Sequence, residues 1–304
     1  MIVSKLVKEQ ESVQVGRKLV ADYMLLIKLR LSFLVVFSAA ITYLYGTGGN
    51  FSWMNLLILV AGGFLVTGAS NGINQILERH LDGLMDRTRD RPLPTLRMGV
   101  PEAVVACAVM GTTGIALLYM LNPLTALLGA FSLISYAFIY TPLKQLTSFS
   151  VYVGAVPGAM PPILGWVAAT GHLGIEALVL FAIQFVWQFP HFWAIAWVLD
   201  DDYQKAGFRL LPSGEGRSKK SATFILVATV LLIPVSVLPS FLNMGGYVLA
   251  LVSLLAGILF LIQAIRLYKT CTIKAASKLM FSSFIYLPLV QLALLIDKLF
   301  THAG

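Results

Sequence analysis

The segment from Asn74 to Pro94 reads NQILERHLDGLMDRTRDRPLP and directly follows an apolar run at residues 56–73. Asn74, Glu78 and Asp82 recur at every fourth position, so we expect their oxygen-bearing side chains on one face of a helix. Acidic groups at the end of a hydrophobic helix are costly unless they meet water, a cation or a partner. Arg87 and Arg91 follow at once. The pattern favours an anionic ligand carried by a divalent metal, because Mg²⁺ takes carboxylate and phosphate oxygens and arginine binds phosphate bidentately. A solvated helix end with i,i+4 ion pairs is the alternative.

The composition predicts a polytopic membrane protein. Hydrophobic residues make up 58% of the 304 residues, charged residues make up 12%, and the mean hydropathy is +0.83. A soluble domain is nearer half apolar and a quarter charged. The two cysteines, Cys107 and Cys271, fall in or near apolar segments and suggest neither a disulfide framework nor a metal motif. The net charge of +8 fits the positive-inside rule better than it fits a nucleic-acid partner.

Nine apolar stretches are long enough to cross roughly 30 Å of hydrocarbon as helices. We therefore expect an all-α fold, with a basic lead-in at residues 1–30 and a single nine-helix domain at residues 31–304. The first span extends backwards through residues 24–28, and the proline- and glycine-rich fifth span is expected to be kinked or broken. The predicted spans are about residues 31–45, 53–77, 101–121, 124–140, 151–169, 175–199, 222–239, 247–267 and 280–300.

The basic residues predict the orientation. With nine spans, every Lys and Arg except Lys298 falls on one face of the membrane. The positive-inside rule then places the amino terminus in the cytoplasm and the carboxyl terminus outside. The first twenty residues resemble neither a signal peptide nor a transit peptide, which indicates a bacterial inner membrane.

A second acidic cluster, Asp200 to Asp202, stands where the sixth span meets a cytoplasmic loop, with Lys205 just beyond it. Two such clusters on one membrane face could bind two metal ions that clamp one diphosphate. A capped, solvated helix end is the alternative. Tyr140 and Lys144 lie four apart at another cytoplasmic connection, where Lys144 is a candidate diphosphate contact or a simple membrane anchor.

Together, these motifs resemble the intramembrane aromatic prenyltransferase (UbiA-type) superfamily over nearly the whole chain. The row from Asn74 to Asp82, the pair Tyr140 and Lys144, and the acids Asp201 and Asp202 carry the resemblance. Further segments are similar to the branch that farnesylates protohaem IX, namely Met85 to Pro94, Gly158 to Trp166, Pro190 to Ala194 and Asp201 to Gly207. Relatives of the quinone pathway usually carry aspartate where Glu78 and His191 stand.

This resemblance implies a helix bundle around a central cavity that is open to lipid, with the active site on the cytoplasmic face. The substrates would be farnesyl diphosphate and protohaem IX (haem B), and water addition would give haem O for a haem A synthase or a terminal oxidase. One Mg²⁺ would be held by Asn74, Glu78 and Asp82 and a second ion by Asp201 and Asp202. The remaining implied substrate contacts are Arg87, Arg91, Tyr140, Lys144 and Lys205.

His191 replaces an acid and cannot carry the same charge. We hypothesise that it contacts haem, either as an axial iron ligand or through a propionate, although a buried histidine in a helix is more often a structural group. Two other functions remain open. One is prenyl transfer to a quinone precursor, which Glu78 and His191 argue against. The other is a secondary transporter, whose charges usually lie near the membrane midplane within internal repeats.

Overall fold

The computed structural model describes the backbone of residues 19–302 and the side chains up to residue 298. Within these residues the chain is helical, without strands, and nine helical spans are long and apolar enough to cross a membrane. The all-α, nine-span prediction is therefore confirmed. The spans are α2 (Leu29–Gly46), α3 (Trp53–Asp82), α4 (Val100–Leu121), α5 (Pro123–Ile134) with η1 (Ser135–Tyr140) and α6 (Thr141–Leu143), α7 (Ser150–Gly158) with α8 (Met160–Thr170), α9 (Ile175–Val198), α11 (Lys219–Phe241), α12 (Tyr247–Thr270) and α13 (Ile273–His302).

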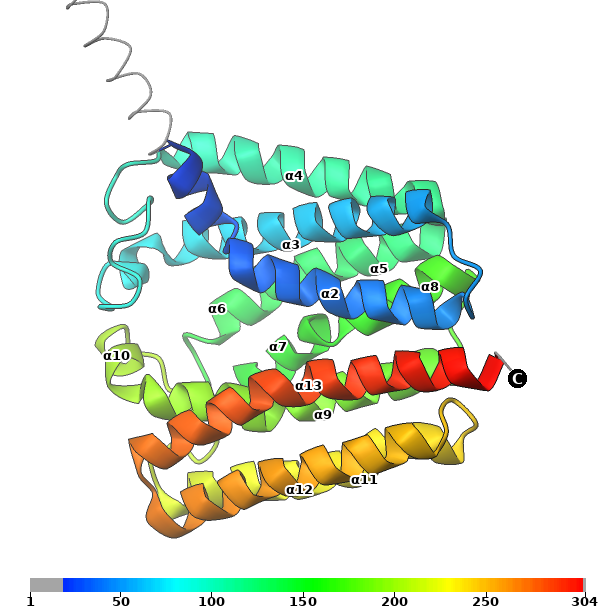
Figure 1. The fold of residues 1–304 in the computed structure, drawn as a ribbon. Coiled ribbons are helices and arrows are strands. Elements are labelled where there is room, and N and C mark those ends of the chain that lie inside the picture. The colour runs from blue at the N-terminus through cyan, green and yellow to red at the C-terminus, as the bar shows by residue number, and fades with distance from the viewer. Residues whose placement is uncertain (1–18, 303–304) are drawn as a thin grey trace, which may run out of the picture.

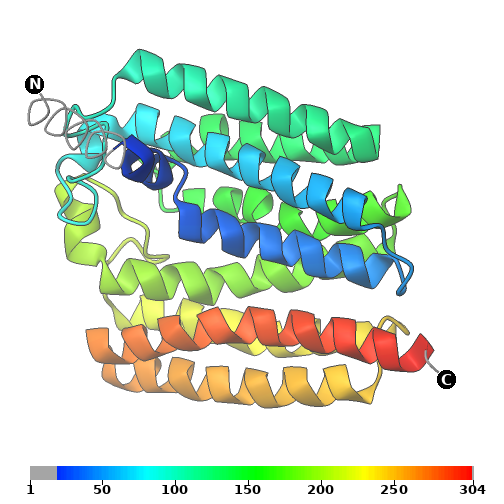
Figure 2. The same cartoon turned by 45° about the horizontal axis from the view of Figure 1, so that its top comes forward.

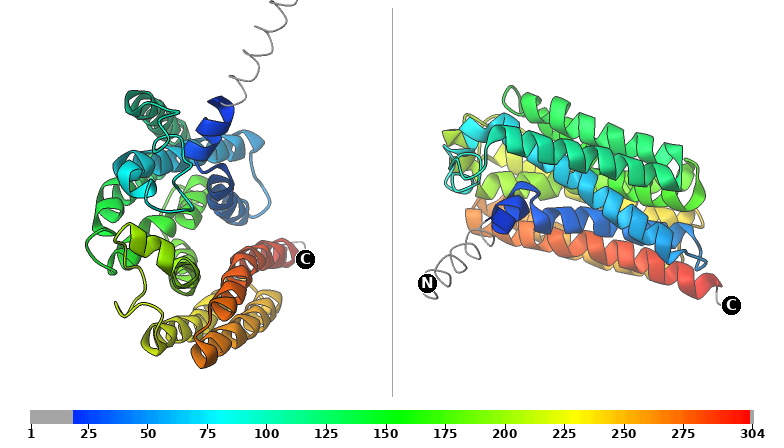
Figure 3. Two further views of the ribbon diagram at one scale, coloured as in Figure 1. Left: turned by 90° about the vertical axis from the view of Figure 1, so that its left-hand side faces the viewer. Right: turned by 90° about the horizontal axis from the view of Figure 1, so that it is seen from above.

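The spans lie roughly parallel to one another (Figures 1 and 2). Seen end-on, they follow one another around the bundle (Figure 3, left). α2 packs against α3 and α8, α9 packs against α11 and α13, and α13 also packs against α2. The contact between the last and first spans closes the ring. The short helix α10 (Asp200–Lys205) and the segment 83–99 lie at one end of the bundle, opposite the carboxyl terminus (Figure 1).

The pair α3 and α4 packs through small residues. A Cβ atom at Gly114 would lie 2.9 Å from the backbone oxygen of Gly62, so only glycine permits this approach. Small residues perform this function in membranes because lipid is as apolar as leucine and close van der Waals packing must hold the helices together. The approach fixes α3, whose far end carries the acidic row.

The fifth span is broken where the prolines predicted it. α7 ends before Ala159, which has φ −96° and ψ 1°, and two prolines occupy the first turn of α8. Side chains of α9 donate to backbone carbonyls at the break, with Gln184 Nε2 2.8 Å from Gly158 O and Gln188 Nε2 2.9 Å from Ala155 O, which also accepts the N–H of Ala159. A broken helix is tolerated in a membrane because neighbouring side chains satisfy its backbone in this way.

Replacing Gln184 with leucine is expected to destabilise the bundle by about 2 kcal/mol, because several interhelical hydrogen bonds are lost together. Its Oε1 also accepts from Ser38 Oγ at 2.7 Å and from Gln291 Nε2 at 3.1 Å, which joins α9 to α2 and α13. Unfolding in mixed micelles would measure the effect. Gln263→Leu, outside this network, is the control, and equal midpoints for the two variants would contradict the prediction.

Several helices extend beyond the predicted apolar cores. α3 continues to Asp82 rather than ending near residue 77, α11 begins at Lys219, and α13 begins at Ile273 rather than near residue 280. Charged residues such as Lys and Glu are good helix formers, so a helix does not stop where the hydrocarbon stops. The basic residues predicted in the connection between the last two spans therefore belong to helices, and only Cys271 and Thr272 join α12 to α13.

Candidate active site

A polar pocket of about 140 Å³ lies where α3, η1, α6 and the segments around α10 meet. It brings together seven of the eleven residues singled out in the sequence, namely Asn74, Glu78, Asp82, Arg87, Arg91, Tyr140 and Lys144. It also contains polar residues that were not predicted as site residues, namely Lys28, Tyr136 and Tyr203. Asp201, Asp202, Lys205 and His191 do not line it.

The row on α3 is almost completely buried, with Asn74, Glu78 and Asp82 each at most 2% exposed. Asp82 Oδ2 lies 2.7 Å from Arg91, and Glu78 Oε2 lies 2.7 Å from Lys144. The three oxygen-bearing side chains therefore line one pocket, as their spacing of four residues predicts. Each acid is also held by a cation from another part of the chain, as buried charge requires.

Glu78 Oε1 is buried and has no hydrogen-bond partner within the described structure. Such an unpaired carboxylate oxygen costs free energy unless a cation or donor meets it. Within the described residues, no three or more His, Cys, Asp or Glu side chains form a metal-binding group by themselves. Two carboxylates and an amide oxygen nevertheless fit Mg²⁺, which takes one or two protein carboxylates together with phosphate oxygens and water.

The pocket has an excess of positive charge. Its four cationic side chains, Lys28, Arg87, Arg91 and Lys144, face only two carboxylates, Glu78 and Asp82. Taken with formal charges, two positive charges remain unbalanced. A partly buried site of this kind attracts an anion, because less water is available to screen it than in solution.

Lys28 reaches the pocket through an unusual backbone. It caps α2 in the left-handed region, with φ 49° and ψ 58°, and its Nζ donates to Asn74 Oδ1 at 3.2 Å. Polar side chains of α3 hold the preceding turn, since Asn71 Nδ2 donates to Ile27 O at 3.3 Å and Gln75 Nε2 donates to Leu26 O at 2.6 Å. Non-glycine residues rarely adopt this conformation, so the local sequence does not predict the left-handed backbone of Lys28.

Tyr136 and Tyr140 belong to the π-helix η1. The backbone N–H of Thr141 bonds to Tyr136 O, five residues back, and Thr141 Oγ1 accepts from Asn74 Nδ2 at 3.2 Å. The Lys144 ammonium lies 5.8 Å from the Tyr140 ring centroid. A π-turn is a common device at functional sites because its extra residue re-aims the side chains that follow.

An apolar chamber of about 100 Å³ adjoins the polar pocket. Tyr136 lines both spaces, and on α3 the chamber residue Asn71 lies one turn before the pocket residue Asn74. One face of α3 thus runs from apolar to polar. The chamber is lined by Leu31, Val35, Val36, Ala39, Leu59, Gly63, Val66, Thr67, Ser70, Asn71, Leu118, Ser132, Tyr136, Pro157, Gly158, Pro161 and Leu164.

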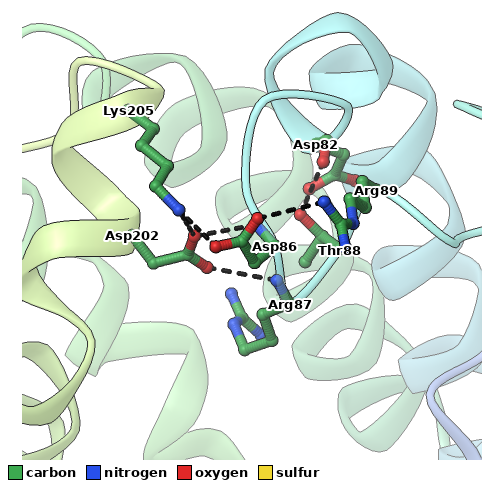
Figure 4. Close-up of polar contacts among 7 residues, drawn as sticks. All are labelled: Asp82, Asp86, Arg87, Thr88, Arg89, Asp202 and Lys205. Carbon is green, nitrogen blue, oxygen red and sulfur yellow. Dashed lines mark hydrogen bonds and ion pairs between the residues drawn. The ribbon is translucent and has the colours of Figure 1, made fainter.

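The neighbouring acids Asp201 and Asp202 have different roles, and Figure 4 shows the contacts of Asp202. Asp202 accepts the backbone N–H groups of Asp86 at 2.8 Å and Arg87 at 3.2 Å, while Lys205 pairs with both Asp86 and Asp202. Burial opposes the Asp202 carboxylate, but these hydrogen bonds outweigh it and hold the pKa of Asp202 below its ordinary value. Asp201 is 76% exposed and pairs with Arg217 at 2.9 Å, so it points away from the pocket.

Asp202→Ala is expected to loosen the segment 83–99, whereas Asp201→Ala is not. Amide hydrogen exchange at Asp86 and Arg87 should speed up by roughly tenfold or more in the first variant, because both N–H groups lose their acceptor. Exchange mass spectrometry of peptides covering residues 83–99 would measure this. Equal protection in the two variants would show that Asp202 does not hold this segment.

His191 lies in an aromatic cluster on α9, stacked on Trp187 with ring centroids 4.4 Å apart. Its Nδ1 is 2.7 Å from Ser283 Oγ, and that hydroxyl donates to Met280 O at 2.5 Å. Because the serine proton is already used, Nδ1 must be the donor and Nε2 keeps a lone pair. This is the tautomer that an axial ligand needs, and a haem contact at His191 stays a prediction.

Comparison with known proteins identifies the family of this chain. The model of the UbiA prenyltransferase family matches residues 34–287. The chain is 48% identical over 279 residues to a protoheme IX farnesyltransferase of Cytophaga hutchinsonii, covering 91% of this chain and 98% of that protein. It is 36% identical to the protoheme IX farnesyltransferase of Nitrosomonas eutropha, covering 99% of both chains.

Solved structures share the fold. A digeranylgeranylglyceryl phosphate synthase aligns with a TM-score of 0.77 at 21% identity, covering 92% of this chain and 98% of that one. A UbiA homologue from Archaeoglobus fulgidus, bound to GPP and Mg²⁺, aligns with a TM-score of 0.68 at 14% identity, covering 90% and 99%. On the family match and the identity to these relatives, the chain belongs to the UbiA prenyltransferase family.

Proposed function

We propose that this protein transfers the farnesyl group of farnesyl diphosphate to a vinyl group of protohaem IX and that addition of water then gives haem O. The names of its relatives support the substrates. The structural observation that carries the proposal is the single face of α3, which joins a partly buried cationic pocket to an apolar chamber. A prenyl diphosphate has the same two parts in the same order.

Mg²⁺ is the metal that we propose, held by Asn74, Glu78 and Asp82. The unpaired Glu78 Oε1 supports this set, and the A. fulgidus homologue has been solved with GPP and Mg²⁺. When bound, the ion would neutralise part of the diphosphate charge. A second ion on Asp201 and Asp202 stays a prediction, since the structure uses Asp202 to hold the backbone of Asp86 and Arg87.

The cations of the pocket would bind the remaining diphosphate charge. Arg87, Arg91, Lys144 and Lys28 all line the same pocket, whereas Lys205 lies outside its lining and pairs with Asp86 and Asp202. As the bond between carbon and oxygen breaks, negative charge grows on the leaving diphosphate. Fixed cations then stabilise the transition state more than the ground state, which is what raises the rate.

The apolar chamber would protect the allylic cation from water until the haem vinyl group attacks it. Water then captures the resulting cation next to the porphyrin, which leaves a hydroxyethylfarnesyl substituent. A quinone precursor is the second candidate acceptor, and Glu78 and His191 argue against it. We place the reaction at the cytoplasmic face of a bacterial plasma membrane, upstream of a haem A synthase or a terminal oxidase.

Product analysis tests the proposal. Membranes that contain the protein would be incubated with haem B, farnesyl diphosphate and Mg²⁺, and the extracted haems would be separated with mass detection. We expect a new haem that is heavier by a farnesyl group and a hydroxyl, and we expect EDTA to abolish it. Unchanged haem, together with prenylation of an aromatic acid in a parallel reaction, would instead assign the protein to the quinone branch.

A further inference from the structure

The end of the apolar chamber farthest from the polar pocket is closed by leucines. Leu59 of α3 and Leu118 of α4 are at most 1% exposed, and both line the chamber. Leu118 occupies space that two glycines leave free. A Cβ atom at Gly62 would lie 3.0 Å from Leu118 Cδ2, and one at Gly129 would lie 2.5 Å from Leu118 Cδ1. The Leu118 side chain therefore packs between α3 and α5. Together with Leu59 it closes this end of the chamber, which we call the floor.

Gly63 lies on the same face of α3, one turn closer to the polar pocket than Leu59. A Cβ atom there would meet only Val36 Cγ2, at 3.6 Å, which is ordinary van der Waals contact. Val36 itself lines the chamber. Close helix packing therefore does not require this glycine, unlike Gly114. Because Gly63 has no side chain, the chamber is wider at this level.

Distances along α3 can be compared with the length of a prenyl chain. At a rise of about 1.5 Å per residue, Gly63 lies about 16 Å along α3 from Asn74, and Leu59 lies about 22 Å from it. An extended isoprene unit contains four main-chain bonds of about 1.5 Å and projects to about 5 Å. Three units would therefore end at the level of Gly63, and a fourth would meet the floor at Leu59 and Leu118.

From this geometry we infer that Leu118 and Gly63 determine the length of the prenyl chain that the enzyme accepts. The inference rests on the proposed function, because it assigns the chamber to the prenyl tail. Leu118 excludes a fourth isoprene unit by filling the floor. Gly63 admits the third unit by leaving its level open. The selected substrate is then a diphosphate with three units rather than two or four.

The test compares the binding of geranyl, farnesyl and geranylgeranyl diphosphates to the purified protein with Mg²⁺, together with haem prenylation by each. Leu118→Ala should raise the preference for geranylgeranyl over farnesyl diphosphate roughly tenfold or more, as expected for removing bulk from an apolar pocket. Gly63→Ala should raise the preference for geranyl over farnesyl diphosphate severalfold. Leu117→Ala, next to Leu118 but not lining the chamber, should keep the wild-type order.

The possible outcomes distinguish the chain-length inference from the proposed function. Unchanged preferences in both variants, with an active wild type, would overturn the inference and leave the proposed function intact. Chain-length shifts in binding without any haem product would support the inference and count against haem as the acceptor. Binding that does not depend on chain length in the wild type would overturn the inference. Should Leu118→Ala fail to fold, Gly63→Ala still decides, because its methyl group meets no close neighbour.

Discussion

Asp82→Asn is expected to lower haem O formation by about 10³-fold while the protein stays folded. The substitution keeps the size and hydrogen-bonding shape of the side chain but removes a negative charge from the row that we propose to hold Mg²⁺. It also leaves Arg91, now 2.7 Å from Asp82 Oδ2, without its anionic partner. Loss of a single group that stabilises charge in the transition state typically costs two to three orders of magnitude, roughly.

Single-turnover assays at several Mg²⁺ concentrations would measure this loss. A defect in metal binding should be partly relieved by high Mg²⁺, whereas a folding defect should not. Asp90→Asn is the control, since it makes the same chemical change on an exposed residue of the adjoining segment. Wild-type turnover in Asp82→Asn would exclude the row on α3 as the metal site.

Lys28→Met is expected to weaken the binding of farnesyl diphosphate by roughly 10- to 100-fold, the usual worth of one hydrogen bond to a charged group. The same change should lower the thermal stability of the protein without ligand only slightly, because the lost hydrogen bond to Asn74 is offset by the removal of a cation from a pocket with an excess of positive charge. Weaker binding with nearly unchanged stability is the signature of a ligand-binding cation rather than a structural one.

Equilibrium binding of farnesyl diphosphate and thermal unfolding in detergent would be measured together for this variant. Arg30→Met provides the comparison, because Arg30 lies two residues away and is exposed. Lys28→Arg should recover part of the affinity. A large fall in the unfolding temperature of Lys28→Met, with unchanged affinity, would make Lys28 a structural residue only.

The sequence predicted the parts of the site that depend on local periodicity. Asn74, Glu78 and Asp82 share a pocket because residues four apart share a helix face, and the prolines of the fifth span broke it as expected. Spacing also pointed to Tyr140 and Lys144. These features need no knowledge of distant contacts.

Other parts depend on tertiary contacts and could not be predicted. Lys28 falls within the basic lead-in predicted at residues 1–30, and nothing in the local sequence marks it as a pocket residue. Its left-handed backbone is held by Asn71 and Gln75 of another helix. Asp201 and Asp202 are equivalent in the sequence pattern, yet Asp201 is exposed and pairs with Arg217, whereas Asp202 accepts two backbone N–H groups. Periodicity cannot distinguish neighbours whose partners lie far along the chain.

The π-helix η1 means that the fourth span carries one residue more than regular α-helical winding would need. Each residue of an α-helix turns the chain by about 100°, since 3.6 residues complete a turn. Deleting one residue within 135–140 would thus swing Lys144 about a quarter-turn or more away from Glu78 without changing any side chain in the pocket. The orientation of Lys144 toward the polar pocket therefore depends on a single inserted residue. Homologous chains should tolerate substitutions along this span far better than changes in its length.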